Sequence, residues 1–521
     1  MRDWVYTRKA YVNWLSKTKL RREFSDNVKF DDLSLWWIAN LMDKDNWNDT
    51  KWYVNLNKKL NSKEENLKIN INYFVLSMKL IKRFISKLIS RFIIKLILSD
   101  SFKISEKKYK RDCIYTLFFN FTNFKGKFID RQYGLLSFKK RREKAYLIEL
   151  PENLFFLNKI LDTKKKLKNV PVDYVILNSI IKFSDIIKVY FNSISLLFRT
   201  FKILNKSNYF LIKNVDCREV LENQLISSFF GPIQEQILKG IALKRSLNLI
   251  KPKNFINCFC FYPQARVLYF YARKSNVKNI INTNHAIYSE QNIFWNFNKI
   301  DFSSKKTSYY SPQPDIFCCK GMQDYQKLKK TFKNEKILLI GCLKTEVRPY
   351  NLKWKTHKKS KELYKKKIIT ILSALSDYQS IIKILNQCDL DKYTIYVSPH
   401  PLVRKQTYKF FNDNFKSNYI EVANIKKTRL LQISEYIIFG ETQMGTELAI
   451  KNYNVIRVYE NEFIPHYNTN DEIPTACDKY KLRELLTKRR INKKIGQLEK
   501  NYFYKYDNKA STRLQKILDK L

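Results

Sequence analysis

The chain has 521 residues, of which 45% are hydrophobic and 15% aromatic, so it can bury large cores and is not a disordered chain. This length predicts two or three domains. The formal charge of +50 suggests an anionic partner, but the lysines are spread through every segment, without a helix-turn-helix, zinc-finger spacing or basic tail. We therefore expect no nucleic-acid partner and assign the charge to an acidic lipid surface.

The nine cysteines form no CxxC pair, and several lie within apolar runs. They are expected to be inert core thiols of a reducing, cytoplasmic compartment. Residues 1–19 carry charges throughout and have no apolar stretch, so we expect no signal peptide.

Residues 1–150 do not alternate strands and helices, and we interpret them as an N-terminal helical and mixed region. Residues 32–42 are predicted to form a helix that starts after an acidic pair and has an aromatic face. Trp36 and Trp37 on that face are expected to pack in the core or at a domain interface.

Residues 74–98 are apolar or Ser except for six cations, five of which recur every fourth residue. Six cations are too many for a membrane-spanning helix. Two interpretations stay open: a basic amphipathic helix lying in a membrane surface, or a helix packed on the domain with a solvated lysine face. A second run at 184–206 supports the membrane interpretation modestly. The six cations are Lys79, Lys82, Arg83, Lys87, Arg91 and Lys95.

From about residue 151 the pattern changes to alternating strands and helices, which predicts a doubly wound α/β layer over residues 151–343. Its strands are expected at 172–177, 255–262, 277–283, 315–319 and 336–340, with a long helix at 217–244. Residues 344–366 are lysine-rich and contain a proline, and we interpret them as a linker. A second alternation fills residues 367–521. The predicted fold class is α/β, with two Rossmann-like lobes after a mainly helical N-terminal extension.

The second lobe contains a histidine between two prolines, in Ser398-Pro-His-Pro401. The prolines restrict the backbone at the end of a predicted strand and direct the imidazole of His400 outward. Such a side chain can donate a hydrogen bond to a phosphate, more strongly when it is protonated. The alternative is a turn histidine without chemical function.

A second polar turn follows the strand at 437–439 and opens a helix, at Gly440-Glu-Thr-Gln-Met-Gly-Thr-Glu447. Parallel sheets bind ligands beyond the carboxyl ends of their strands, where a helix N-terminus attracts anions. The alternative is an ordinary strand-to-helix turn with Thr as its N-cap. Neither GxxxxGKS nor GxGxxG follows a strand, which argues against a nucleoside triphosphatase and a nicotinamide enzyme. The residues predicted to bind a nucleotide mono- or diphosphate and its ribose are His400, Thr442, Gly445, Thr446, Glu447, Lys344 and Ser373.

Paired lobes with these two turns resemble GT-B glycosyltransferases, particularly the bacterial sialyltransferase, polysialyltransferase and capsule-transferase group. With Leu33-Ser-Leu-Trp-Trp37 and Phe128-Ile-Asp-Arg-Gln-Tyr-Gly134, the chain is more closely similar to bacterial surface-carbohydrate biosynthesis proteins. The resemblance implies that His400, Thr442 and Thr446 contact the donor phosphate and that Glu447 holds the ribose. Where sialyltransferase-like enzymes have two adjacent small hydroxyl residues, this chain has Thr442-Gln443, which leaves the donor sugar open.

The resemblance implies a glycosyltransferase acting on a nucleotide-sugar donor and a glycan or lipid-linked acceptor, at the cytoplasmic face of a membrane. Relatives carry an acid near the position of 262–264, which is absent here, and we take His285 first and Glu290 second as the catalytic base. No metal and no further cofactor is expected, and Asp389-Leu-Asp391 is interpreted as a solvated turn. The alternatives are a CDP-polyol phosphotransferase and a noncatalytic scaffold of a polysaccharide assembly complex.

Overall fold

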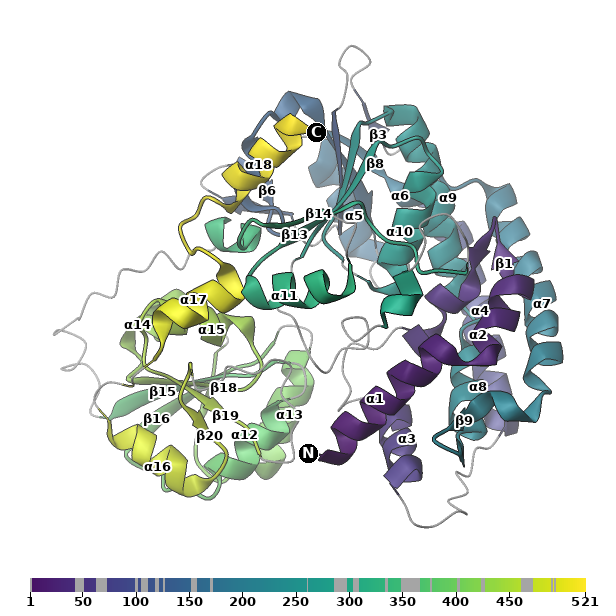
Figure 1. Cartoon of the computed structure of the whole chain (residues 1–521). Helices are drawn as coiled ribbons and strands as arrows, with labels where there is room; N and C mark the ends of the chain where they lie inside the picture. The colour runs from purple at the N-terminus through teal and green to yellow at the C-terminus, as the bar shows by residue number, and fades with distance from the viewer. Residues whose placement is uncertain are drawn as a thin grey trace.

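A computed structural model of the chain contains two extended, mainly parallel sheets, each in its own lobe (Figure 1). The smaller lobe, with the second sheet, lies at the lower left of Figure 1, and the helical N-terminus lies to the right. The structure describes residues 2–521 except for 43–50, 62–72, 99–101, 105–110, 118–120, 125–126, 151–156, 169–171, 260, 285–297, 303–308, 333–335, 348–365, 375–376, 401–402, 423–426, 461–471, 489–490 and 492.

The first sheet has the order β14-β13-β12-β11-β4-β7-β8-β3, and all its pairs are parallel except that of β3 with β8. Counted along the chain from β4, its strands run 3-2-1-4-5-6-7, which begins with the Rossmann order. The bounds are β3 Phe102–Lys103, β4 Asp112–Leu117, β7 Lys144–Glu149, β8 Asp173–Ile176, β11 Asn254–Asn257, β12 Asn279–Thr283, β13 Ile316–Cys319 and β14 Lys336–Leu339.

This sheet crosses the boundary predicted near residue 150, because β4 and β7 lie in its middle. The first lobe therefore starts well before residue 151. The sequence concealed this because β4 and β7 are connected by the hairpin of β5 (Phe121–Phe124) and β6 (Lys127–Asp130) and by 3-10 turns such as η4 (Gly134–Phe138). No strand-to-helix alternation marks that crossover.

Helices cover both faces of the first sheet. Cys113 and Tyr115 of β4 share one core cluster with helices α9 and α10, whereas Ile114 belongs to the cluster on the opposite face. This alternation is the period of two expected of a strand buried on both sides. The helices of this lobe are α1 Arg2–Lys17, α2 Lys19–Asn27, α3 Lys51–Asn61, α4 Tyr73–Ile97, α5 Leu157–Lys168, α6 Leu177–Ile180, α7 Phe183–Leu204, α8 Arg218–Ser227, α9 Pro232–Ile250, α10 Pro263–Arg273 and α11 Met322–Thr331.

The second sheet has the order β17-β16-β15-β18-β19-β20 and is parallel throughout. Its strands also run 3-2-1-4-5-6, so the predicted fold class of two Rossmann-like lobes is confirmed by topology. The strands are β15 Lys367–Leu372, β16 Tyr393–Ser398, β17 Ile420–Glu421, β18 Tyr436–Phe439, β19 Val455–Val458 and β20 Thr475–Ala476; the helices are α12 Tyr378–Leu385, α13 Arg404–Asn414, α14 Lys427–Ile433, α15 Gln443–Ile450 and α16 Lys479–Thr487.

The last two helices connect the lobes, which corrects the assignment of all residues 367–521 to the second lobe. Helix α17 (Ile495–Phe503) packs on α15 of the second lobe and α11 of the first. Helix α18 (Ala510–Lys520) returns to the first lobe, where Leu514 and Leu518 are buried against Ile114 and Leu343. Of the predicted linker, residues 348–365 lie outside the described part of the chain.

Two predicted helices are wrong in detail. Residues 32–42 form no α-helix: Asp31 and Asp32 have positive φ and turn the hairpin of β1 (Lys29–Phe30) and β2 (Leu33–Ser34). The 3-10 turns η1 (Leu35–Ile38) and η2 (Asn40–Met42) follow, and Trp36 and Trp37 are buried as expected. The helix predicted at 217–244 is interrupted between α8 and α9, where Gly231 adopts φ +123° before Pro232.

Among the described helices, none is both long and apolar enough to cross a membrane.

Candidate functional site

The two polar turns predicted to bind the donor lie at the same edge of the second sheet. Strands β16 and β18 both pair with β15, and Leu372 at the end of β15 is level with Ser398 on one side and Phe439 on the other. His400 and Thr442 follow these two residues. With one strand between them, the two strand ends are about 10 Å apart.

The topological switch point of the second sheet lies between β15 and β18, where strand order reverses. Asp377 spans it: its carboxylate accepts hydrogen bonds of 2.7 Å from the backbone N–H groups of Ala374, after β15, and Glu441, after β18. Gly440 makes room for this carboxylate, because a Cβ there would overlap Asp377. Ser373 is also buried here, and its hydroxyl has no hydrogen-bond partner among the described residues.

Burial raises the pKa of Asp377 to about 7, although the N–H groups of Glu441 and Ala374 favour its charged form. A carboxyl group that titrates near neutrality at a switch point is characteristic of functional sites. Asp377 is not among the residues predicted from the sequence. No local sequence pattern indicated a role for Asp377, because its partner Glu441 is 64 residues away in the chain.

The start of α15 is capped as predicted: the Thr442 hydroxyl accepts a hydrogen bond of 3.3 Å from Met444 N–H. Packing explains the glycine at position 445, because a Cβ there would overlap the Phe439 ring. Thr446 is fully buried. Glu447 is also buried and accepts a 2.8 Å hydrogen bond from the Gln443 side chain.

A buried ion pair between β19 and the turn at residues 440–447 fixes that turn. The Arg457 guanidinium on β19 lies 2.7 Å from the Glu441 carboxylate, and its Nε donates to the Gly440 carbonyl at 3.0 Å. Both side chains are inaccessible to solvent. The backbone before α15 is therefore fixed at two points, by Arg457 and by Asp377.

This edge of the second sheet faces the first lobe. The Gln443 side chain reaches Cys342 Sγ, beyond the end of β14, at 3.9 Å. Gln323 on α11 donates a 2.9 Å hydrogen bond to Tyr502 on α17. Lys344 lies just beyond Cys342 on the 3-10 helix η10 (Leu343–Val347), half-buried in the first lobe. The carboxyl ends of both sheets thus point toward the boundary between the lobes.

The switch point of the first sheet, between β4 and β11, carries a polar cluster that sequence analysis missed. Glu149 at the end of β7 accepts hydrogen bonds from Gln264 at 2.8 Å and from Tyr115, and it forms a 2.9 Å ion pair with Lys239. Glu149 thus places a carboxylate beside Gln264, close to residues 262–264, which contain no acid themselves. The two side chains that meet are 115 residues apart, so no local pattern indicated it.

The same switch point contains a buried acid from the 128–134 motif. Asp130 is fully buried, and burial raises its pKa to about 6 against the hydrogen bonds from Thr116 and from backbone N–H groups. Its Oδ2 has no hydrogen-bond partner among the described residues. Gly134 of this motif adopts φ +56° and lies directly against Leu343, which ties the motif to η10.

His285 and Glu290, the predicted bases, lie outside the described residues, as does Pro401 beside His400. Within the described part of the chain, no three His, Cys, Asp or Glu side chains gather as metal ligands. Asp389 and Asp391 are exposed, and the Asp389 carboxylate accepts a hydrogen bond from Asp391 N–H, so the predicted solvated turn is confirmed.

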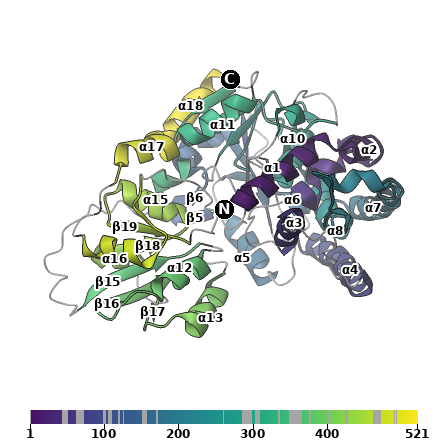
Figure 2. The same cartoon turned by 60° about the horizontal axis from the view of Figure 1, so that its bottom comes forward.

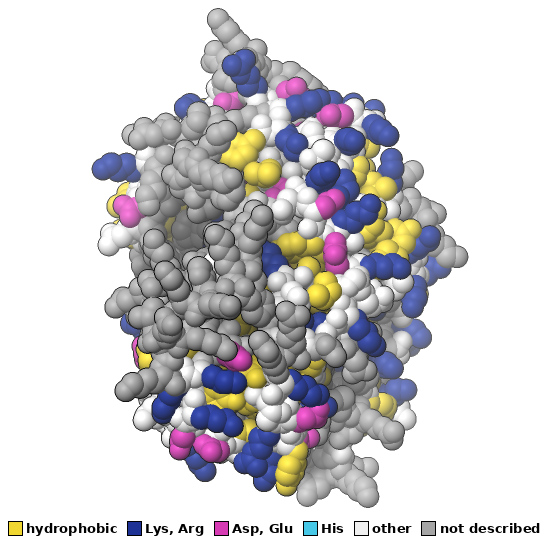
Figure 3. All heavy atoms as spheres, turned by 90° about the vertical axis from the view of Figure 1, so that its left-hand side faces the viewer, with side chains coloured by type: hydrophobic (Ala, Val, Ile, Leu, Met, Phe, Trp, Pro, Cys, Tyr) yellow, Lys and Arg dark blue, Asp and Glu magenta, His cyan; other side chains and the backbone are white. Residues whose placement is uncertain are grey.

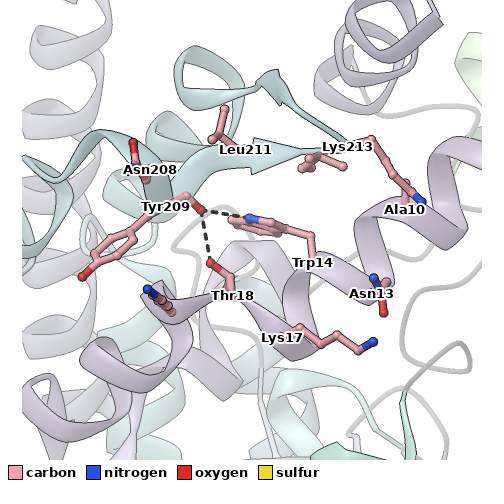
Figure 4. A pocket seen from close by; sticks show the side chains of 11 residues that line it. Ala10, Asn13, Trp14, Lys17, Thr18, Asn208, Tyr209, Leu211 and Lys213 are labelled. Atoms are coloured by element: carbon pink, nitrogen blue, oxygen red, sulfur yellow. Dashed lines mark hydrogen bonds between the residues drawn. The ribbon is translucent and has the colours of Figure 1, made fainter.

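A pocket of about 360 Å³ lies elsewhere, between α1 and the β9–β10 hairpin (Leu211–Ile212, Val215–Asp216) (Figure 4). The indole N–H of Trp14 and the hydroxyl of Thr18 both donate to the Tyr209 carbonyl, at 2.9 and 3.2 Å. Lys17, Lys19 and Lys213 are among its lining residues, and none of the described residues that line it is an acid or a histidine. It contains none of the predicted site residues.

The basic side chains are distributed over the surface without a single stripe on the face seen in Figure 3. Lysine and arginine (dark blue) occur on its upper and lower parts, with acidic side chains (magenta) among them. This distribution agrees with the sequence, in which lysines occur in every segment.

No family model and no curated protein matches the chain. Among solved structures, it is similar to the UDP-GlcNAc 2-epimerase of Neisseria meningitidis bound to UDP-GlcNAc, with 11% identity, 79% of this chain and 100% of that chain covered, and a TM-score of 0.44. The chain is also similar to S. aureus MnaA with UDP, with 11% identity, 78% of this chain and 95% of that chain covered, and a TM-score of 0.41. For the wall teichoic acid polymerase TagF the identity is 13%, 87% of this chain and 98% of that chain are covered, and the TM-score is 0.39. With TM-scores below 0.5, these likenesses add nothing to the strand order, which alone carries the fold assignment.

Proposed function

We propose that this chain is a GT-B type glycosyltransferase that moves a sugar from a nucleotide-sugar donor to a surface-polysaccharide or lipid-linked glycan acceptor. One observation supports this most: His400 and the start of α15 flank the switch point of a Rossmann-ordered sheet, at the edge that faces the other lobe. Parallel α/β sheets bind nucleotides at this place.

In this proposal the second lobe holds the donor. The imidazole of His400 and the N-terminus of α15 offset the charge that develops on the leaving phosphate, without a metal ion. Thr442 and Thr446 donate to phosphate oxygens, Lys344 approaches from the first lobe, and Ser373 and Glu447 bind the ribose side. Thr446 and Glu447 are buried, so the donor must contact them through a small movement of α15.

The base that deprotonates the acceptor hydroxyl comes from the first lobe in this proposal. Glu149 joins His285 and Glu290 as a candidate, because it is a carboxylate at the switch point of the first sheet. Its carboxylate is held in the ion pair with Lys239, and acceptor binding would have to loosen that pair for it to act.

The test compares His400→Ala with Lys409→Ala, an exposed residue on α13 of the same lobe. UDP, CMP, GDP and CDP are each screened by thermal shift, and transfer is then measured with sugars on the nucleotide that stabilises the chain. We expect His400→Ala to keep the thermal midpoint without nucleotide but to lower transfer by at least about a hundredfold. Full activity in that variant would refute the site.

The product distinguishes the related chemistries. A glycosidic product supports the proposal, whereas a phosphodiester formed from a CDP-polyol would identify a polyol-phosphate transferase that uses the same edge. If no nucleotide stabilises the wild-type chain at any concentration, the noncatalytic scaffold replaces both enzymes.

A further inference from the structure

Helices α4 and α7 lie side by side at the end of the molecule away from the second sheet (Figures 1 and 2). Phe84 meets Tyr190 edge to face at 5.0 Å, and Phe92 stacks on Phe183 at 5.6 Å between ring centroids. The order of these contacts makes the two helices antiparallel. Their outward side is called the α4–α7 face below.

Apolar side chains line this face. On α4 the exposed ones are spaced by three, four, four and seven residues, and on α7 by four, four, three, four and three, so each set forms one stripe. Together they are 11 of the 19 large hydrophobic side chains that are exposed in the described part of the chain. They are Met78, Ile81, Ile85, Ile89 and Leu96 on α4, and Phe183, Ile187, Phe191, Ile194, Phe198 and Phe201 on α7.

The C-terminal part of the cation stripe of α4 points toward the domain, so only its N-terminal part can form the solvated lysine face left open by the sequence. Lys87 pairs with Glu235, Arg91 is buried, and Lys95 donates a 2.6 Å hydrogen bond to the Ser179 carbonyl. The helix thus turns these cations toward the domain and its isoleucines toward solvent. An exposed apolar patch of this size on a folded chain indicates a docking surface.

The remaining cations frame the apolar stripes. Lys79, Lys82 and Arg83 are exposed on α4, as are Lys188, Arg199 and Lys202 on α7. Helix α4 contains no acidic residue. The single acid of α7, Asp185, is buried and paired with Arg245. The face therefore presents apolar side chains and positive charge, with no exposed acid on either helix.

We propose that the α4–α7 face docks on the surface of a bilayer that contains acidic phospholipids. The phenylalanines and isoleucines enter the boundary between headgroups and acyl chains, and the six exposed cations contact lipid phosphates. A second copy of the chain fits this face less well, because two such faces would bring twelve cations together without a compensating acid. The inference rests on these two helices alone and is independent of the proposed function.

Vesicle sedimentation of the full chain tests it. We expect binding to vesicles with about 30% phosphatidylglycerol in phosphatidylcholine, weaker binding to phosphatidylcholine alone, and loss of binding as salt rises from about 0.1 to 0.5 M. Phe191→Ser with Phe198→Ser, and separately Lys79→Glu with Lys82→Glu, should each reduce partitioning to acidic vesicles by about tenfold or more. All four side chains are exposed, so thermal melts should match the wild type.

The controls are matched in chemistry and placed on the second lobe. Tyr480→Ser removes an exposed aromatic ring, and Lys405→Glu with Lys409→Glu reverses two exposed cations. These should leave partitioning within about twofold of the wild type. The proposal is overturned if the wild type does not sediment with acidic vesicles, or if the variants of the α4–α7 face bind them as well as the controls do. A concentration-dependent dimer that the face variants disperse, without vesicle binding, would assign the face to a second copy instead.

Discussion

At the scale of single residues, the second lobe depends on a carboxyl group that closes the gap between its first and fourth strands. Asp377 is fixed by two backbone N–H groups from different loops, and Gly440 leaves the space that its carboxylate fills. Thr442 and Gly445 each have a local structural role: Thr442 is the N-cap of α15, and the missing side chain of Gly445 leaves room for the Phe439 ring. Two of the residues predicted for donor binding therefore also hold the turn in place.

The pH dependence of stability provides a test of Asp377. Its folded-state pKa of about 7 lies above the ordinary value of 3.8, so the native state binds the proton more tightly than the unfolded chain. The contribution of Asp377 to the free energy of unfolding is full below pH 3.8 and is lost as pH rises to about 7, by roughly 4 kcal/mol at most. Asp377→Asn removes this titration. Thermal midpoints measured between pH 4 and 7.5 should fall less in the variant, and identical slopes would contradict the assignment.

At the scale of elements, periodicity predicted that α4 exists but not which side each part of it buries, and it predicted no helix at the position of α18. The cations of α4 that recur every fourth residue suggested a solvated face, whereas Glu235 and the Ser179 carbonyl draw two of them inward. Helix α18 belongs in sequence to the second lobe, yet Glu346 on η10 accepts a 2.8 Å hydrogen bond from Ser511 N–H at its start. Contacts from distant segments decided both cases.

Helix α18 should contribute to the core of the first lobe. Leu514 is fully buried there, so Leu514→Ala should cost about 2 to 5 kcal/mol through lost burial and the cavity left behind. Lys516→Ala, exposed on the same helix, should change stability by less than about 0.5 kcal/mol. Urea unfolding followed by circular dichroism measures both. Equal, small effects would show that α18 is not part of that core.

At the scale of the whole molecule, the two lobes are joined by packing as well as by the covalent chain. Helix α17 contacts both lobes, with Gln323 bonded to Tyr502 and Gly321 closely apposed to Asn501. Helix α18 then enters the core of the first lobe. The C-terminal segment of the chain thus completes the core of the first lobe.

This arrangement predicts that the chain assembles from two fragments. Residues 1–355 and 356–521, produced together as separate polypeptides with a tag on the first, should purify as one complex. Replacing Leu514 and Leu518 with Asp in the second fragment should abolish co-purification, because buried, unpaired carboxylates are strongly disfavoured. Recovery of the tagged fragment alone, soluble and folded, would show that the first lobe does not need helix α18.

The sequence by itself determined the alternation of strands and helices through residue 458 of the second lobe and its two polar turns, because strand, turn and helix signals are local and were uninterrupted there. It also determined that His400 and Thr442 follow strands of one sheet. Only the tertiary structure decided that β4 and β7 belong to the first lobe, that Glu149 meets Gln264, and that Asp377 joins two loops. Those contacts bring together residues that are tens to more than a hundred positions apart, and a pattern read over neighbouring residues contains no information about such pairs.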